Sequence, residues 1–367
     1  MLLIIITRFF LREHMTSKTK QLTKCGSFTD IHWGCKSNSE QHNQDCLNFI
    51  TWFCDQVRGN QEIDHVIFMG DWYENRSAVN ISTMNYSYQG AKKLNELGIP
   101  VYFIIGNHDL YHRHTRNVHS VVNFHEFENF VIVDHPIVVD CIGDRGSVLS
   151  PYLFHDEYPE LAKFLKYKTW WGHFEFKGFV VTGCNILMPT GPDPKSFAGP
   201  DRIFSGHFHK RQLSENIVYI GNTFPTNFGD AGDSNRGMAV YNHNGNKLEF
   251  IDWPDAPLYI KTTLSSLIDE SIILPKHSRV KCLVDLPISF EESTLIKSTY
   301  ITDYNLREFS LEESSHLAET LSETSTDIQS MDMEMHSVDE MVIHMLSDIK
   351  SDKIDNAILV EQYKLLG

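Results

Sequence analysis

The 367-residue sequence lacks the marks of a disulfide-stabilised or membrane-spanning chain. Its seven cysteines are an odd number and form no C-x-x-C pair, which favours reduced thiols in a cytosol. The apolar run that opens the sequence is broken by Arg8, far short of the ~20 residues of a membrane helix, and no small-residue cleavage site follows. We therefore expect a cytoplasmic protein without a membrane partner. Residues 1–22 are interpreted as an N-terminal extension from a start codon placed before Met15, with a signal-like or peripheral anchor as the alternative.

Basic residues are also scarce, with 32 Lys and Arg against 48 Asp and Glu and a formal net charge of −16. Residues 254–367 hold 9 of the basic and 21 of the acidic residues, and no Lys or Arg occurs between residues 308 and 349. Most of the excess negative charge therefore lies in the C-terminal part, so it does not exclude a DNA substrate for the first 253 residues. We interpret residues 310–338 as an acidic linker and residues 339–367 as C-terminal helices.

One pattern recurs along the first part of the chain: a short apolar run, a glycine, then polar residues. It occurs in HVIFMGD (65–71), VYFIIGNHD (101–109), KTWWGHFE (168–175) and RIFSGHFH (202–209), and more weakly in GSFTDIHWG (26–34). Such runs predict buried strands, and helical spacing at 40–58 and 81–97 predicts helices between some of them. Alternation of this kind indicates an α/β fold over residues 23–253. Residues 254–309 are predicted to be a small α+β appendage.

The polar residues at these strand ends are of metal-binding types. They are Asp30, His32, Asp71, Asn107, His108, Asp109, His173, His207 and His209. Carboxylate, imidazole and amide groups together suit Mn²⁺, Fe²⁺ or Zn²⁺. Two such ions about 3.5–4 Å apart need a shared carboxylate, for which Asp71 is the natural candidate. Each fragment alone could be a solvated turn, but five at strand ends indicate one site.

The order D-x-H, GD, GNHD, GH, GHxH resembles that of the calcineurin-like metallophosphoesterases. With IVYIGNTFPTNFGDAGDSNRGMAVYN (217–242) after the last histidines, it is most similar to the SbcD-type recombination nucleases and their branch in T-even-like phages. The resemblance implies a β-sandwich flanked by helices and two divalent ions, most often Mn²⁺, with Mg²⁺ as the alternative. It implies one ion on Asp30, His32, Asp71 and His209, and the other on Asp71, Asn107, His173 and His207.

The same resemblance assigns chemistry and partners. His108 would protonate the leaving 3′ oxygen of a DNA phosphodiester, and Asp109 would orient the His108 ring. The activity would be exonuclease and endonuclease cleavage in recombination and double-strand-break repair. The partner would be an SbcC-type coiled-coil ATPase docked through C-terminal helices, with a nuclease homodimer inside a heterotetramer. A phage-encoded chain would act in the cytoplasm of its bacterial host.

One departure and two rival functions accompany this resemblance. Glu74 stands where the family commonly has Asp or His, and its extra methylene favours supporting a ligand over being one. The GDWYENR segment lacks the G-D-x-x-D-R-G of protein phosphatases, which disfavours a phosphatase or cyclic-nucleotide phosphodiesterase. A non-enzymatic scaffold is disfavoured because no ligand position is lost.

The loop after Asp109 supplies the candidate DNA contacts. Arg113 and Arg116 are expected to bind phosphates, unless RHTRN (113–117) is only a solvated basic turn. His112 and His114 have no predicted role in the chemistry.

Overall fold

The structure is a computed structural model that describes residues 21–143, 146–181 and 186–313, together with residues 356, 358 and 360. Most of the N-terminal extension, the acidic linker beyond residue 313 and the C-terminal helices predicted at 339–367, apart from those three positions, lie outside the described residues. Within the described part of the chain, no helix is long and apolar enough to cross a membrane.

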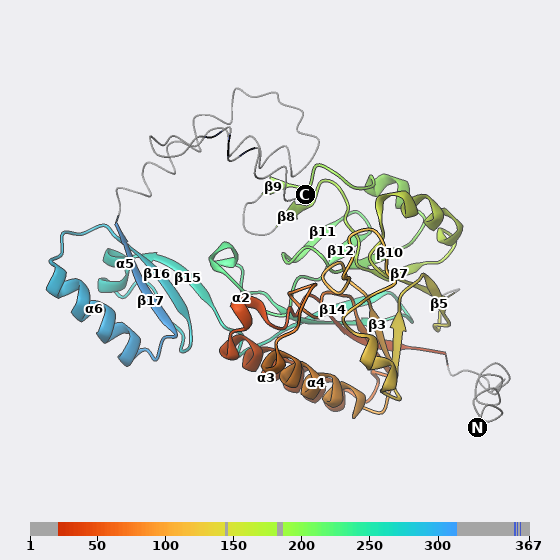
Figure 1. Cartoon of the computed structure of the whole chain (residues 1–367), viewed down its shortest axis with the longest axis horizontal. Helices are drawn as coiled ribbons and strands as arrows, with labels where there is room; N and C mark the ends of the chain where they lie inside the picture. Colours follow the sequence, from red (N-terminus) through yellow and green to blue (C-terminus); the bar gives the residue numbers. More distant parts are fainter. Residues whose placement is uncertain are drawn as a thin grey trace.

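Two six-stranded sheets form the body of the protein (Figure 1). In order across the first sheet, the strands are β14 (Lys247–Asp252), β13 (Gly237–Asn242), β1 (Lys24–Phe28), β2 (His65–Phe68), β3 (Val101–Ile104) and β4 (Phe130–Val133). Strands β1 to β4 run parallel to one another, whereas β13 is antiparallel to β1. The carboxyl ends of β1, β2 and β3 therefore meet at one edge.

The central strands of the second sheet are also parallel. Its strands, in order, are β11 (Gln212–Ser214), β12 (Ile217–Tyr219), β10 (Arg202–Ser205), β7 (Thr169–Gly172), β6 (Ser147–Ser150) and β5 (Ile137–Val139). Strands β6, β7, β10 and β12 are parallel, so the segments after β7 and β10 leave the sheet side by side. A two-stranded ribbon of β8 (Val180–Val181) and β9 (Ile186–Leu187) lies apart from both sheets.

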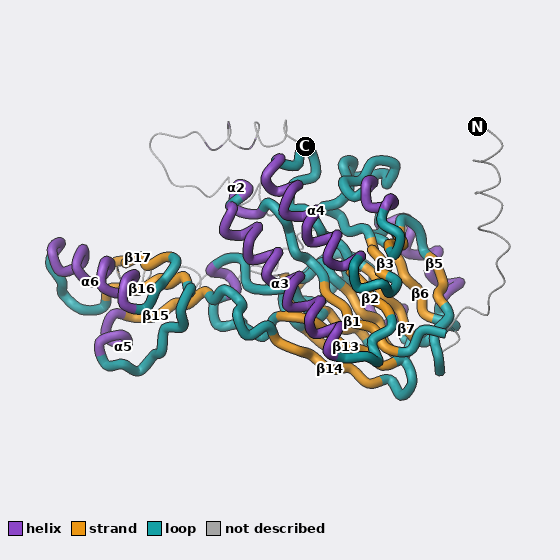
Figure 2. The backbone as a smooth tube through the Cα atoms, turned by 90° about the horizontal axis from the view of Figure 1, so that it is seen from below, coloured by secondary structure: helices purple, strands orange, loops and turns teal. Residues whose placement is uncertain are grey.

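Apolar layers separate the two sheets from each other and from the helices. Cys25, Ile67 and Trp171 belong to the layer between the sheets. Alternate residues of the first sheet, including Phe28 and Phe68, pack instead against α3 (Glu40–Gly59) and α4 (Ile81–Asn95), which lie across that sheet in Figure 2. The 3₁₀ helices η2 (His155–Phe164) and η3 (Pro194–Phe197) pack on the outer face of the second sheet. The other short helical segments are α2 (Cys35–Asn38), η1 (Val122–Glu126) and η4 (Phe228–Asp230). The predicted β-sandwich flanked by helices is confirmed.

A smaller unit follows β14 and stands to one side of the sandwich (Figure 1). It consists of β15 (Tyr259–Thr263), α5 (Leu264–Ile268), β16 (Arg279–Val284), α6 (Phe290–Asp303) and β17 (Glu308–Glu313), with its three strands parallel. This appendage has its own apolar core, and a bidentate ion pair joins it to the sandwich. Arg307 donates to both carboxylate oxygens of Asp45 on α3, over 2.6 and 2.7 Å.

The boundary predicted at residue 309 falls inside a strand. β17 continues to Glu313 and pairs along its length with β16. The acidic run that begins at Glu308 suggested a linker, but Phe309 and Leu311 belong to the core of the appendage. These apolar residues alternate with Glu308 and Ser310, which is the pattern of a half-buried strand. The linker prediction considered only the charge of this segment and overlooked that alternation.

Candidate metal centre

The loops that follow β1, β2, β3, β7 and β10 bring the predicted ligands together at one edge of the sandwich. Four of those ligands have left-handed backbone conformations, with φ of 52° at Asp30, 50° at His32, 60° at Asp71 and 85° at His207. Such conformations cost side-chain-bearing residues about 1–3 kcal/mol each and persist where the surrounding fold enforces them. Their concentration in one place indicates a functional site.

Glycine is required where these loops touch. A Cβ built on Gly106 would lie 2.2 Å from Asp71 Oδ1, and one built on Gly206 would lie 2.1 Å from Thr29 Oγ1 and 2.9 Å from Asp30 Oδ2. Both contacts are far inside van der Waals distance. The glycine after each apolar run therefore lets neighbouring strand ends approach until their ligands share one space.

The first group of side chains consists of Asp30, His32 and His209. His32 Nε2 lies 3.1 Å from His209 Nε2, and Asp30 Oδ1 lies 3.9 Å from each of these nitrogens. The nearest point equidistant from all three atoms is about 2.1 Å from each, which is the usual length of a bond from zinc or a similar ion to N or O. The donor set and its spacing therefore fit one divalent ion. Burial and the nearby His32 ring lower the pKa of His209 to about 4, so that ring is neutral at pH 7.

The second group consists of Asp71, Asn107, His173 and His207. The Asn107 amide oxygen lies 2.8 Å from His173 Nε2 and 3.0 Å from His207 Nδ1. Asp71 Oδ2 lies 3.3 Å from His173 Nε2. His173 Nδ1 donates to the Met69 carbonyl over 2.7 Å, which leaves Nε2 as the nitrogen that faces the group. These four side chains could hold a second ion.

Asp71 lies between the two groups. Its Oδ2 atom is 3.8 Å from His32 Nε2 as well as 3.3 Å from His173. Burial alone would lower the pKa of both histidines, but the carboxylates outweigh it: Glu74 and Asp71 raise the pKa of His32, and Asp71 raises that of His173, each to about 9. Burial would raise the pKa of Asp71, but His173 holds it well below its usual range. Protonated histidine rings thus offset the negative charge of the carboxylates. Bound divalent ions would offset that charge in place of the protons.

His108 and Asp109 follow Asn107 but do not contact each other as expected. His108 Nδ1 lies 2.7 Å from the Glu74 carbonyl oxygen, and the His108 ring meets the His32 ring edge-on at 5.0 Å. The buried Asp109 carboxylate instead accepts the backbone N–H groups of Asp71 and Gly106, over 3.0 and 2.9 Å. A carboxylate surrounded by backbone donors has no oxygen to spare for an imidazole. The role predicted for Asp109 is therefore wrong in its detail: it clamps the β2 and β3 loops together, and the Glu74 carbonyl orients His108.

Two glutamates support ligand rings. Glu74 Oε2 lies 2.8 Å from His32 Nδ1, and the His32 contact lowers the pKa of Glu74 to about 2. The supporting role expected of Glu74 requires such a contact and stays a prediction. Glu175 Oε2 lies 3.3 Å from His207 Nε2, a contact that sequence reasoning missed. Glu175 stands two residues after His173, and the alternation of side chains along an extended segment could have identified it.

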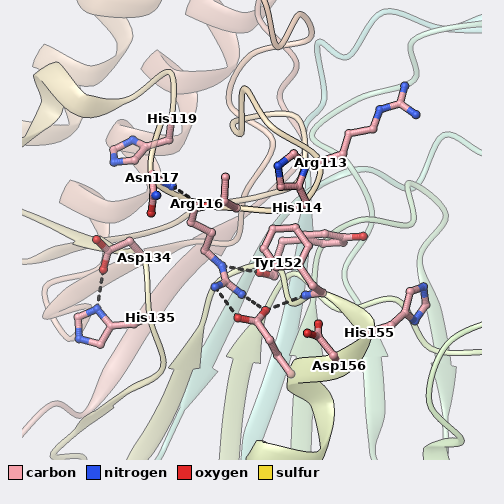
Figure 3. Close-up of a pocket in the computed structure, with 13 residues that line it drawn as sticks. Arg113, His114, Arg116, Asn117, His119, Asp134, His135, Tyr152, His155 and Asp156 are labelled. Atoms are coloured by element: carbon pink, nitrogen blue, oxygen red, sulfur yellow. Dashed lines mark hydrogen bonds and ion pairs between the residues drawn. The ribbon is translucent and has the colours of Figure 1, made fainter. Parts of the chain in front are cut away.

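Figure 3 shows a surface pocket of about 770 Å³. Tyr152 lines it, and the Tyr152 ring also lies 6.2 and 6.1 Å from the rings of His173 and His207. Arg116 does not face this pocket as a free cation. Its guanidinium pairs with both carboxylate oxygens of Glu157, and its Nε donates to the Tyr152 carbonyl.

The structure contradicts the phosphate contact predicted for Arg116, because its partly buried guanidinium is already paired with the Glu157 carboxylate. Arg113 is exposed and extends away from the Arg116 pair in Figure 3, so it remains a candidate for phosphate contact. His114 also lines the pocket, and its ring lies 5.6 Å from that of His112. Neither His112 nor His114 belongs to either group of candidate ligands.

Comparison with known proteins identifies relatives of this architecture. The family model described as calcineurin-like phosphoesterase matches residues 26–211, about half of the chain. Exonuclease subunit 1 of Enterobacteria phage T4 is 26% identical over 229 residues, which are 60% of this chain and 65% of that protein. This chain thus matches less than two thirds of the length of that relative.

Solved structures with similarity to this chain include three proteins. A dimetal phosphatase from Danio rerio aligns with a TM-score of 0.39 and 8% identity over 61% of this chain and 93% of its own. A nuclease from Pseudomonas putida aligns with a TM-score of 0.30 and 15% identity over 61% and 87%. A purple acid phosphatase from yellow lupin (Lupinus luteus) seeds aligns with a TM-score of 0.35 and 13% identity over 65% and 48%.

Proposed function

Since this chain belongs to the calcineurin-like phosphoesterase family, we propose that it is a two-metal DNA nuclease that hydrolyses phosphodiester bonds in recombination and double-strand-break processing. The observation that carries the proposal is the position of Asp71, whose Oδ2 atom faces His32 of one ligand group and His173 of the other. A shared carboxylate is what two ions about 3.5–4 Å apart require.

The ligand sets follow from the two groups of side chains. Asp30, His32, Asp71 and His209 would hold one ion; Asp71, Asn107, His173 and His207 would hold the other. Carboxylate and amide oxygens beside imidazoles suit Mn²⁺, with Mg²⁺ as the alternative. When bound, two such ions supply Lewis-acid polarisation of a phosphodiester and activation of water at neutral pH.

His108 is the proposed acid. Its Nδ1 atom faces a carbonyl oxygen, which can only accept a hydrogen bond, so Nδ1 carries a proton in every state of the ring. The reactive nitrogen is therefore Nε2, on the opposite side of the ring. In its protonated form, the ring donates the Nε2 proton to the leaving 3′ oxygen, so that the products are a 5′-phosphate strand and a 3′-hydroxyl strand.

A DNA substrate is supported by the T4 relative, which is named as an exonuclease subunit. The pocket beside the centre offers Tyr152 as an aromatic surface near the ligand rings, and the exposed Arg113 lies on the same rim. Aromatic stacking and phosphate contacts are the usual means of holding single-stranded ends. Exonuclease and endonuclease cleavage are both proposed.

The word "subunit" in the name of that relative supports a larger assembly. We assign as partner a coiled-coil ATPase of the SbcC type, with two copies of this chain in a heterotetramer. Residues 339–367 are the proposed docking segment. The site of action would be the cytoplasm, that of the bacterial host for a phage protein.

A cleavage assay tests this function. Linear duplex DNA, single-stranded DNA and a small phosphomonoester are each incubated with the protein and Mn²⁺ or Mg²⁺. We expect DNA cleavage that requires Mn²⁺, that EDTA abolishes and that H108S lacks. Strong monoester hydrolysis without DNA cleavage would replace the nuclease with a phosphatase, the alternative that the family also contains.

A further inference from the structure

A second group of metal-binding side chains lies at the opposite end of the sandwich. Cys25 is near the start of β1, His65 is the first residue of β2, and His243 directly follows β13, which runs antiparallel to β1. The metal centre described above is built beyond the carboxyl ends of β1 and β2, so this group occupies the other edge. Cys25 and His65 are fully buried, and His243 is 5% exposed.

The three side chains converge. Each offers one ligand atom, and these atoms all lie within 4.8 Å of one another. Strand register places Cys25 directly beside His65 on one side and Tyr241 on the other. The His65 and His243 rings stack with centroids 5.5 Å apart. The convergence therefore follows from three adjacent strands of one sheet.

One nitrogen of His65 is held by a carboxylate. His65 Nδ1 lies 2.7 Å from Asp64 Oδ1, and the Asp64 carboxylate is itself fixed by the backbone N–H groups of Thr23 and Lys24. A carboxylate on the far nitrogen is the usual support of a metal-binding histidine, since it fixes the tautomer and turns the other nitrogen towards the ion. In His65 that other nitrogen is Nε2.

The remaining nitrogens are buried and unpaired. His65 Nε2 has no hydrogen-bond partner among the described residues, and the same is true of His243 Nε2, whose ring places Nδ1 3.4 Å from Ser147 Oγ. Leaving a buried polar atom without a partner costs about 1–3 kcal/mol. Two unpaired nitrogens beside a buried thiol would destabilise the fold unless a single bound group pairs with both nitrogens.

We propose that Cys25, His65 and His243 form a structural Zn²⁺ site that is separate from the catalytic centre. Thiolate and imidazole ligands are the donor set of structural zinc. Binding replaces the thiol proton of Cys25 with the ion and releases that proton to solvent, while both histidines bind as neutral rings through their free nitrogens. Burial lowers the pKa of His243 to about 3 and also lowers that of His65, so no proton competes for these nitrogens at pH 7.

Cys141 lies near this group, although its thiol is not one of the three ligand atoms that converge. It is fully buried, pairs with Leu22 in an isolated β-bridge, and lies near enough to Cys25 to add to the burial that raises the pKa of that thiol. If the Cys141 thiol moved into the group when an ion binds, two Cys and two His would form the closed shell typical of structural zinc. The ion would connect β1, β2 and the segment after β13 to one another.

Cobalt(II) distinguishes this site from the catalytic centre, because only this site contains sulfur. The full-length chain is stripped of metal and titrated with Co²⁺, and thiolate-to-cobalt charge-transfer absorption is recorded in the near ultraviolet. We expect the band in the wild type and in D71N, its loss in C25S, and its weakening in H243Q. C54S is the matched control: Cys54 is 1% exposed but lies on the core-facing side of α3, so the band should persist.

Two results would overturn the proposal: a wild type without the band, or a C25S protein that retains it. If C25S does not fold, X-ray absorption of the wild type loaded with Zn²⁺ decides the question. A sulfur neighbour at about 2.3 Å from zinc is expected. Scattering from nitrogen and oxygen alone would exclude the site while leaving the proposed nuclease function untouched.

Discussion

The Nδ1 atom of His108 lies 2.7 Å from the backbone carbonyl oxygen of Glu74. The loop after β2 thus orients a ring that belongs to the loop after β3. Because a backbone carbonyl keeps its position when side chains change, this contact fixes the tautomer of His108 more rigidly than a carboxylate on a free side chain would. The Nε2 atom is left for a substrate.

If His108 acts through Nε2 as an acid, its removal should stop cleavage but leave metal and DNA bound. We expect H108G to lose about 10²–10⁴-fold in kcat, which is the usual contribution of a general acid. Free imidazole added to the H108G protein should restore part of the rate, because it can occupy the space of the ring. Full activity of H108G without imidazole would contradict the role, as would loss of metal binding in step with the rate.

Glu74 should act through His32. Its carboxylate is 2.8 Å from His32 Nδ1, and E74Q removes the charge while keeping the shape. Loss of such a support typically costs about 10–100-fold in metal affinity. Calorimetric titration with Mn²⁺ should show the weakening in one of two binding events. E62Q is the matched control, since Glu62 is exposed and pairs with Lys24. Equal affinity of E74Q and wild type would exclude the role.

Arg113 and Arg116 should now behave differently towards DNA. R113A is expected to flatten the salt dependence of DNA binding by roughly one phosphate contact, a slope change of about 0.9 in duplex DNA. R116A should leave that slope unchanged but lower the melting temperature, because Glu157 would keep a partly buried charge without its partner. Fluorescence anisotropy at several salt concentrations measures the slopes. An unchanged slope in R113A would remove Arg113 from the DNA-binding surface.

Gly106 should be intolerant of a single methyl group. In G106A the new Cβ would lie 2.3 Å from the Asp71 backbone nitrogen as well as against its carboxylate, so the shared ligand must move. We expect loss of cleavage and weaker binding of both ions. G59A is the control, because nothing lies within 4 Å of a Cβ at that helical position. It should keep full activity and gain up to about 1 kcal/mol of stability. Equal activity of the two variants would contradict this packing.

The sequence predicted the features that depend on local spacing. Short apolar runs followed by glycine identified β1, β2, β3, β7 and β10, because burial and strand ends leave a pattern within a few residues. The strand β6 was missed, since its four residues, SVLS, contain only two apolar side chains. Its place beside β7 is set by pairing that no local pattern encodes.

Within the site, the residue types were predictable but their partners were not. Asp109 was identified as important, yet its carboxylate binds backbone groups of a loop more than thirty residues earlier. Arg116 was taken for a DNA contact because Glu157, which neutralises it, is 41 residues away in sequence. Pairing across such separations depends on the folded chain and leaves no local sequence pattern. A contact such as that of Glu175, two residues from a candidate ligand, could have been predicted from the nearby sequence.

The ion pair between Arg307 and Asp45 gives the appendage a mechanical connection to the catalytic edge. Asp45 lies on α3 one turn after His42, whose Nε2 atom donates to the His32 carbonyl over 2.9 Å. The ion pair, α3 and the His42 hydrogen bond therefore form a continuous path from the appendage to the backbone of a candidate metal ligand. A force that acts on the appendage would reach the metal centre along the same path.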